Sequence, residues 1–420
     1  MFAFLLVSVI ILAGLGSASA VSDDVITAID DANTRVDEAN TIVEDKVTEI
    51  NETLEEYYDA SNPRGAVSTD LASAVATSQA DTNNVIKLTS DYKISSLVTL
   101  NTDWNDYTID GQGHIIDGDN TAGIFTVSGN NIVLKNIIFI NAQRNNGAVH
   151  ITGINVEIIN CTFAYNNATT GGGAIRGEGN DIVVENSTFY KNINTVASSS
   201  VTSTNGGGAM YFSDKCNKVD VLNCILIDHI STGTGNDIRV NCPITIDGCI
   251  FANTTAKGYG IMYCDASTIK NSTFINYDIP DIMAQGTANK ELNVIDCVFA
   301  NNNLTTAALE KSTSVTGSIF LNNTGKLVNS AFGLFSDLIF VGNNHTSAAL
   351  VSGTFDNVYN LTYINNTLTS NELLSVTLNN DGNLSDCTFE DNNAKALYLN
   401  LATGDVTRAS NIIINNANVT

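Results

Sequence analysis

The sequence predicts an all-β fold, a right-handed parallel β-helix of about twelve coils, preceded by an α-helical segment. Three observations predict it. A short phrase recurs along the chain at a near-constant interval, each copy alternates in hydrophobicity as strands do, and asparagines recur at fixed positions of the copies. A helical solenoid would need a 3.6-residue period and few β-branched residues, and this chain has the reverse.

The repeated phrase is clearest at residues 160–166 (NCTFAYN) and 186–192 (NSTFYKN). When the large apolar residue of each copy is aligned, successive copies are 20 to 26 residues apart, except for one step of 37 residues. The long step contains the Ser/Thr-rich stretch 194–205, which we expect to be a loop extruded from one coil. The aligned residues are Phe139, Phe163, Phe189, Leu226, Phe251, Phe274, Phe299, Phe320, Phe340, Tyr363, Phe389 and Ile413.

Each copy reads as two short strands joined by a bend. Side chains alternate between the two faces of a strand, so in a straight strand Val156 and Ile158 would point to one face and Cys161 and Phe163 to the other. Both pairs point inward only if the chain bends at Asn160. Asparagine tolerates the left-handed backbone of such a bend. The bend column comprises Asn136, Asn160, Asn186, Asn223 and Asn271, with Asp296 and Asp386 in later copies, and a second asparagine column closing the phrase comprises Asn166, Asn192, Asn276, Asn322 and Asn392.

The N-terminal residues precede the repeats and have different patterns. Residues 1–20 combine an apolar run with Ala18-x-Ala20, which predicts a signal peptide. Residues 21–61 carry an apolar stripe at steps of three and four on an acidic background. Two interpretations stay open for this stripe: a coiled-coil stalk that oligomerises the protein, or a single amphipathic helix that lies on the next domain or packs on nothing. Residues 62–84 are predicted to form a linker and a capping helix, and residues 85–420 the β-helix.

The charge of the chain restricts the classes of partner that it can bind. Charged residues make up 15% of the chain and the formal net charge is −25. Such a surface repels nucleic acid and anionic lipid, and it is a poor surface for gripping polyanionic substrates. We therefore expect no nucleic-acid partner, and membrane contact only through the targeting segment or an anchor missing from this sequence.

Five of the eight cysteines align two residues before the apolar residue, and we expect them to point inward as small hydrophobic groups. Neither CxxC pairs nor Cys/His clusters occur, so no metal or other cofactor is predicted. Disulfides between neighbouring coils, such as Cys224/Cys249 or Cys216/Cys242, remain an alternative. The inward column is Cys161, Cys224, Cys249, Cys297 and Cys387.

Titratable residues show no catalytic pattern, so no catalytic residue is predicted. The carboxylates Asp110, Asp117 and Asp119 suggest either a calcium or acid/base site or ordinary Asp-Gly turns. Arginines lie in separate coils without a clear partner, and the four histidines are expected on the surface or in turns rather than as ligands. These residues are Arg144, Arg176, Arg239, Arg408, His114, His150, His229 and His345. Asn167 and Asn344 are the candidate glycosylation acceptors.

Residues 172–175 (GGAI) and 207–210 (GGAM), each coupled to an F-x-x-N phrase, resemble the repeats of chlamydial polymorphic outer-membrane proteins and of adhesin-like surface proteins of methanogenic archaea. Residues 107–118 resemble the first coils of pectate-lyase-like β-helices. The resemblance implies a non-enzymatic, secreted or cell-surface adhesin-like protein whose partners are host or microbial surface glycans or proteins. The alternatives are a polysaccharide lyase or glycoside hydrolase of this fold and a structural spacer of the cell envelope.

Overall fold

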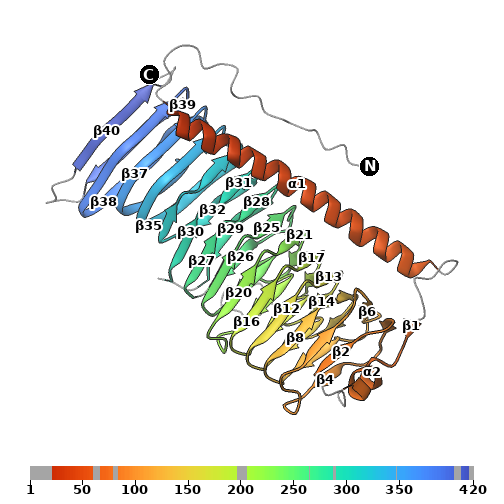
Figure 1. The fold of residues 1–420 in the computed structure, drawn as a ribbon. Coiled ribbons are helices and arrows are strands. Elements are labelled where there is room, and N and C mark those ends of the chain that lie inside the picture. Colours follow the sequence, from red (N-terminus) through yellow and green to blue (C-terminus); the bar gives the residue numbers. More distant parts are fainter. Residues whose placement is uncertain are drawn as a thin grey trace.

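The computed structural model describes residues 21–59, 67–78, 84–195, 206–263, 265–286, 290–346, 348–401 and 408–415. The predicted signal peptide and most of the predicted loop lie outside the described residues. The chain forms a parallel β-helix, a rod of stacked coils with a long helix along one side (Figure 1). The predicted fold class is therefore confirmed, with about 13 turns in place of about twelve.

Three stacks of parallel strands form the walls of the rod. The first stack is β4 (Val98–Leu100), β7 (Phe125–Val127), β11 (Val149–Ile151), β15 (Ile175–Gly177), β19 (Met210–Phe212), β23 (Ile238–Val240), β26 (Tyr259–Tyr263), β29 (Asp278–Gln285) and β32 (Asn303–Glu310). The second stack is β2 (Val85–Lys87), β5 (Thr108–Asp110), β8 (Ile132–Lys135), β12 (Val156–Ile159), β16 (Ile182–Glu185), β20 (Val219–Leu222), β24 (Ile244–Asp247), β27 (Ser267–Lys270), β30 (Leu292–Ile295) and β33 (Ser314–Thr316).

The third stack is β1 (Val67–Ser68), β3 (Asp91–Lys93), β6 (Ile115–Asp117), β9 (Ile138–Ile140), β13 (Thr162–Ala164), β17 (Thr188–Tyr190), β21 (Ile225–Ile227), β25 (Ile250–Ala252), β28 (Thr273–Ile275), β31 (Val298–Ala300) and β34 (Ile319–Leu321). A smaller sheet contains β10 (Gln143–Arg144), β14 (Asn167–Ala168), β18 (Ile193–Asn194) and β22 (Ile230–Ser231). The last coils contain β35 (Thr324–Val341), β36 (Asn344–His345), β37 (Val351–Ile364), β38 (Thr367–Glu390), β39 (Asn393–Leu401) and β40 (Arg408–Asn415).

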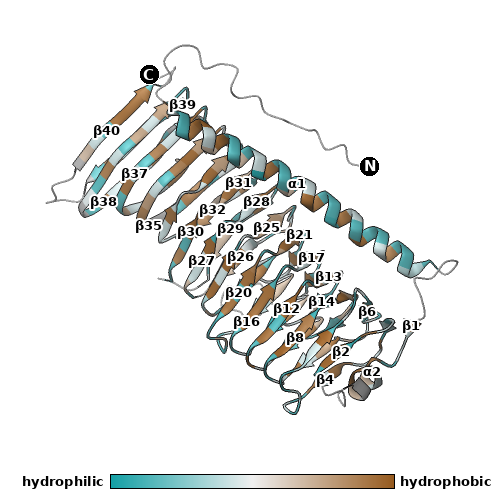
Figure 2. Cartoon of the chain, viewed as in Figure 1, coloured by the Kyte–Doolittle hydropathy of each residue, from teal (hydrophilic) through white to brown (hydrophobic). Residues whose placement is uncertain are grey.

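Hydrophobic residues recur on the strands of successive coils (Figure 2), and their side chains form one continuous buried core. Phe163 stacks on Phe139 and Phe189, with ring centroids 4.6 and 5.0 Å apart. These distances match the spacing between hydrogen-bonded strands, so the repeat period itself places one ring above the next. The alignment was wrong in the last coil: Phe389 pairs with Ile414, and the predicted residue, Ile413, lies one position away and is exposed.

The second asparagine column of the sequence contains two structural positions. Asn276 and Asn322 occupy left-handed bends, with φ of 59° and 52°. The residue that follows each such bend is instead buried. We call these residues the buried ladder: Asn166, Asn192, His229, Thr254, Tyr277, Asn302, Asn323, Asn343, Asn366 and Asn392.

Helix α1 (Asp23–Tyr58) lies along the outside of the third stack (Figure 1). Ser22 caps it by accepting a hydrogen bond from the backbone N of Val25. Its stripe is buried against outward residues such as Ala164 and Ala252, whose small side chains let the helix lie close to the sheet. The structure therefore places the stripe as the second interpretation predicted, on the β-helix, and oligomerisation through this segment stays a prediction. The buried stripe is Ala32, Val36, Ala39, Val43 and Ile50.

Helix α2 (Leu71–Ser78) lies at the N-terminal end of the rod, where Leu71 and Val75 join the apolar interior. Asp70 accepts a hydrogen bond from the backbone N of Ser73 and so caps the helix. Strand pairing begins at Val67, before the predicted start of the β-helix at residue 85. Within the described residues, no helix has both the length and the apolar character needed to cross a membrane.

Candidate binding face

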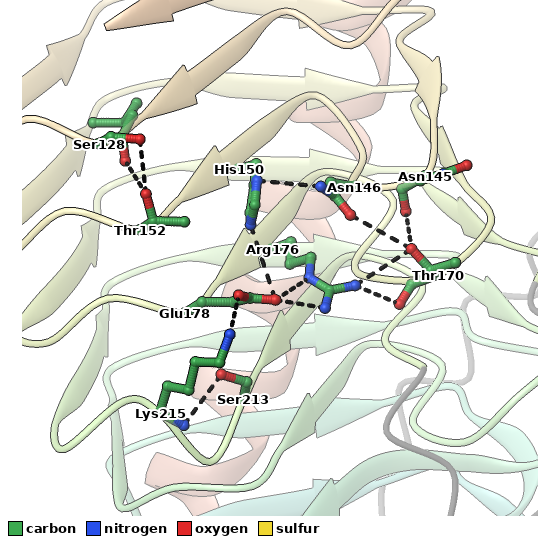
Figure 3. A network of polar contacts seen from close by, with 11 residues as sticks. Ser128, Asn145, Asn146, His150, Thr152, Thr170, Arg176, Glu178, Ser213 and Lys215 are labelled. Carbon is green, nitrogen blue, oxygen red and sulfur yellow. Dashed lines mark hydrogen bonds and ion pairs between the residues drawn. The ribbon is translucent and has the colours of Figure 1, made fainter. Parts of the chain in front are cut away.

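Outward side chains of the first stack form the most developed polar surface of the rod. His150, Arg176, Tyr211 and Arg239 are aligned in register on β11, β15, β19 and β23. Two residues further along, and one residue past the end of each strand, are Thr152, Glu178, Ser213 and Asn241. We call these two rows the network face (Figure 3).

Glu178 is the centre of the network face. Its Oε1 accepts hydrogen bonds from Arg176 Nε at 2.7 Å and Nη2 at 2.5 Å, and its Oε2 pairs with Lys215 Nζ at 2.7 Å (Figure 3). Burial alone would raise the pKa of Glu178, but the hydrogen bonds from Lys215 and Arg176 hold it below its usual value. The carboxylate is therefore ionised at neutral pH and its charge is matched by two cations.

His150 is held as a neutral ring. The amide Nδ2 of Asn146 lies 3.1 Å from His150 Nδ1, and because an amide nitrogen donates, Nδ1 accepts and Nε2 carries the proton. Burial lowers the pKa of His150 despite the nearby charge of Glu178. Its Nε2 is 3.9 Å from Glu178 Oε1 (Figure 3). The Nε2–H group is buried, so the ring does not act as a base toward solvent.

Arg176 connects the network to neighbouring coils. Its guanidinium carbon lies 5.3 Å from the centroid of the Tyr211 ring, and Nη1 donates to the backbone O of Thr170 at 2.9 Å. Its stem passes over Gly171, where a Cβ would lie 2.8 Å from Arg176 Cδ, so a side chain there would displace the arginine. The Tyr211 hydroxyl accepts from Asn241 Nδ2 at 3.2 Å.

Turns on one side extend the polar surface. Thr170 Oγ1 donates to the backbone O of Asn145 at 2.7 Å (Figure 3). Thr169 Oγ1 donates to the side chain of Asn145 at 2.9 Å. On the next coil Ser128 and Thr152 share a hydrogen bond of 2.8 Å. Of this face, Thr152 and Lys215 are exposed, Arg176 and Glu178 are partly exposed, and Tyr211, Ser213 and Arg239 are buried. Among the residues that the structure describes, no group of three His, Cys, Asp or Glu side chains is placed to hold a metal ion.

The predicted bend asparagines all have a left-handed backbone, with φ between 50° and 55°. One pair bonds between equivalent positions of neighbouring coils: Asn160 Nδ2 donates to Asn136 Oδ1 at 2.7 Å. Asn271 instead donates to Asp247 Oδ1 at 2.8 Å. These residues line the bends of the rod rather than one site; they are Asn136, Asn160, Asn186, Asn223 and Asn271.

The five inward cysteines are buried in the interior as free thiols. Sγ of Cys161 lies 3.4 Å from the backbone O of Ile159, and Cys224 and Cys249 are adjacent, with Cys224 N 3.3 Å from Cys249 Sγ. Cys216 and Cys242 are also buried and free, whereas Cys264 lies outside the described residues. The remaining inward cysteines are Cys297 and Cys387.

Burial predicts that these thiols are inert in the folded protein. It raises the pKa of Cys161, Cys297 and Cys387 to about 12 each. Since the ordinary value is 9.0, the reactive thiolate is about a thousandfold scarcer than in an exposed cysteine. Iodoacetamide at pH 8 should leave the three residues unmodified in native protein and modify them in urea, as read by peptide mass spectrometry. Equal labelling in both states would contradict the buried placement.

The other predicted residues do not join the network face. Asn344 is exposed on β36, and Asn167 is partly buried on β14, where its Oδ1 accepts from Thr195 Oγ1 at 3.4 Å. Asp110 and Asp117 behave as turn residues: their Oδ1 atoms accept from the backbone N of the residue two positions later, at 3.1 and 2.8 Å. Asp119 pairs with a lysine, at 2.9 Å from Lys93 Nζ.

The sequence analysis missed the ion pair of Arg176 in this site and the burial of His229 in the buried ladder. Arg176 was expected to lack a partner, yet it pairs with Glu178; the signal was the i, i+2 spacing of opposite charges on one strand. His229 was expected on the surface or in a turn and is fully buried, because it takes an asparagine position of the buried ladder and its Nδ1 accepts from the backbone N of Asn192 at 3.1 Å. Its place three residues after Leu226 is the signal.

No protein-family model and no curated protein matches the sequence. Among solved structures, the surface protein and adhesin PfbA of Streptococcus pneumoniae is similar, with a TM-score of 0.38 and 13% identity over 80% of this chain and 94% of that one. Two structures of the periplasmic alginate epimerase AlgG, one a double mutant, have TM-scores of 0.27 and 0.26 at 9% identity. They cover 79% of this chain and 76% and 78% of their own. An adhesin and an enzyme both resemble the chain this distantly, so these likenesses assign no function, and the resemblance to methanogen and chlamydial repeat proteins stays a prediction.

Proposed function

We propose that this protein is a non-enzymatic, exported, adhesin-like β-helix of the cell surface or extracellular space. It attaches to glycans of a host cell, a microbial cell or a polymer by non-covalent contacts along the network face. The observation that carries the proposal is the charge pairing of Glu178. Its carboxylate is held by Arg176 and Lys215, while His150 is neutral with Nδ1 engaged. General acid–base catalysis needs a group that can take up or release a proton at the working pH, and this arrangement favours binding.

The same arrangement suits hydroxyl-rich ligands. Lys215 keeps 67% of its side chain exposed while it pairs with Glu178, so its ammonium group can contact a bound polymer as well as the carboxylate. The Thr152 hydroxyl of the network face is also exposed, whereas Ser213 is buried and its Oγ accepts from the backbone N of Lys215 at 3.2 Å. Hydrogen bonds of this kind are individually weak, but the strand register repeats them along the rod.

The proposal is tested by a glycan array with a matched pair of variants. Lys215→Ala removes an exposed cation of the network face, and Lys395→Ala removes a cation that is 64% exposed and paired with Glu372 on a distant coil. We expect Lys215→Ala to weaken glycan binding about tenfold, since one charge-assisted hydrogen bond is worth about 1.5 kcal/mol. Lys395→Ala should bind like the wild type, and both should keep the wild-type Tm.

A turnover screen on plant and microbial polysaccharides separates the alternatives. Release of products from any polymer would contradict the non-enzymatic proposal and support the lyase or hydrolase alternative. Such activity would be sought at Asp281, which is 2% exposed and whose pKa burial and the charge of Glu310 raise to about 7. If the protein neither binds nor cleaves any glycan, the result favours the structural spacer.

A further inference from the structure

A shallow depression of about 680 Å³, largely open to solvent, lies where the last turns of α1 meet two bends of the third stack. This volume is within the range of small-molecule sites in proteins. The depression belongs to a different surface from the network face, because α1 covers the third stack and the network face is on the first. We call it the tyrosine pocket; it is lined by Asn51, Leu54, Glu55, Tyr58, Asp59, Asn141 and Tyr165.

Two tyrosine rings of the pocket are fixed in place and still open to solvent. Tyr58 is 58% exposed, and its hydroxyl accepts a hydrogen bond from Asn141 Nδ2 at 2.6 Å. Tyr165 is 36% exposed and packs edge-on against Tyr190, with ring centroids 5.4 Å apart. A ring that is already held loses little conformational freedom when a ligand stacks on it.

The backbone at Tyr165 gives a second, independent observation. Its φ is 59°, in a bend column where the equivalent residues are mostly Asn or Asp, as at Asn141 and Asn253, with φ of 51° and 63°, and where Lys191 of the next coil has φ of 49°. A left-handed backbone suits asparagine and is unfavourable for a bulky aromatic residue. Tyrosine at this bend therefore works against the fold, and strain of this kind is characteristic of functional positions.

We propose that the tyrosine pocket binds a neutral sugar unit of a glycan. A pyranose ring has an apolar C–H face that packs on tyrosine, and its hydroxyls need both donors and acceptors. Asn51 is hydrogen-bonded to Tyr190, and the rest of its amide keeps donor and acceptor capacity; Glu55 and Asp59 supply carboxylate acceptors at the rim. These carboxylates, on a chain of net charge −25, repel sugars that carry carboxylate or sulfate groups. The inference rests on the proposed function only in that the ligand is a glycan.

The test is titration calorimetry of the whole protein with neutral gluco-, manno- and galacto-oligosaccharides and with oligomers of uronic acids. At least one neutral series should bind, and the uronic acid oligomers should not bind at this pocket. Tyr165→Asn should weaken neutral-sugar binding at least tenfold while the Tm stays within about 2 °C of the wild type, because asparagine suits this bend. Tyr58→Ala, at the last residue of α1 and 58% exposed, should have the same effect on binding if Tyr165→Asn does not fold.

Tyr398→Ala is the matched control, since Tyr398 is 53% exposed on β39, far along the chain from the pocket. It should bind like the wild type. If Tyr58→Ala and Tyr165→Asn also bind like the wild type, the pocket is wrong and the proposed function stands, because Lys215→Ala tests that function separately. Binding of uronic acid oligomers that Tyr58→Ala abolishes would overturn the neutral-sugar assignment. A flat result with every glycan would overturn both.

Discussion

Replacing Asn343 with alanine is expected to lower the free energy of unfolding by about 4 kcal/mol. Asn343 is 1% exposed. Its Oδ1 accepts from the backbone N and from Nδ2 of Asn323, both at 2.9 Å, and its Nδ2 donates to the backbone O of Phe320 at 2.9 Å and to Asn366 Oδ1 at 3.0 Å. Alanine leaves these partners buried without water to replace the lost amide, and each costs about 1–3 kcal/mol.

The matched control is Asn379→Ala. Asn379 also donates to a neighbouring coil, from Nδ2 to Asp356 Oδ1 at 2.7 Å, but this hydrogen bond is exposed. Water replaces it, so we expect a loss of less than about 0.5 kcal/mol. Urea unfolding followed by circular dichroism measures both variants. Equal small losses would mean that the buried ladder is not a main source of stability.

The buried ladder also shows how far sequence alone reaches. The repeat interval, the alternation and the bend at Asn160 are local features, so they predict the β-helix and its strands without knowledge of the rest of the structure. Local features do not separate Asn322 from Asn323, because adjacent asparagines differ only in how the bend turns one out and the other in. The stacking of the coils determines which of the two asparagines is buried. In the structure Asn322 has a positive φ and Asn323 is buried.

The two proposed binding surfaces depend on contacts between distant parts of the chain, and the sequence alone does not predict these contacts. The pair Arg176 and Glu178 is local, but Lys215 reaches Glu178 from a turn 37 residues later. The tyrosine pocket needs the C-terminal end of α1 to lie beside the bend at Tyr165. The apolar stripe of α1 is compatible with either a coiled coil or a covered sheet face, and the small outward residues Ala164 and Ala252 select the latter. These two alanines form a continuous surface for α1 only when the coils are stacked.

The buried ladder changes character in three consecutive coils, where His229, Thr254 and Tyr277 replace asparagine. There the fully buried Asp237 takes the polar contacts: Tyr277 Oη lies 2.5 Å from its Oδ2, and Thr254 Oγ1 donates to its Oδ1 at 3.0 Å. Burial raises the pKa of Asp237 to about 7, even though both hydrogen bonds lower it. Burial also lowers the pKa of His229 to about 3.

These two groups act in opposite directions on stability. Between pH 4 and 7 the folded protein keeps a proton on Asp237 that the unfolded chain, with a pKa of 3.8, has released, so stability from this group is lost as pH rises. His229 is neutral when folded and protonated when unfolded below pH 6.5, so its contribution is lost as pH falls. A variant that changes only Asp237 isolates the first effect, because His229 contributes equally to both proteins.

Asp237→Asn keeps the shape and hydrogen-bonding capacity of the protonated carboxyl, since its amide can donate to Tyr277 Oη and its oxygen can accept from Thr254. We expect the variant and the wild type to be similarly stable at pH 4, where both side chains are uncharged. The variant should then gain relative to the wild type by about 4 kcal/mol as pH rises to 8, from a shift of about 3 pKa units at 1.36 kcal/mol each. Urea unfolding at pH 4, 6 and 8 measures the difference. A difference that stays constant with pH, or that falls as pH rises, would show that Asp237 is ionised throughout and that its hydrogen bonds outweigh its burial.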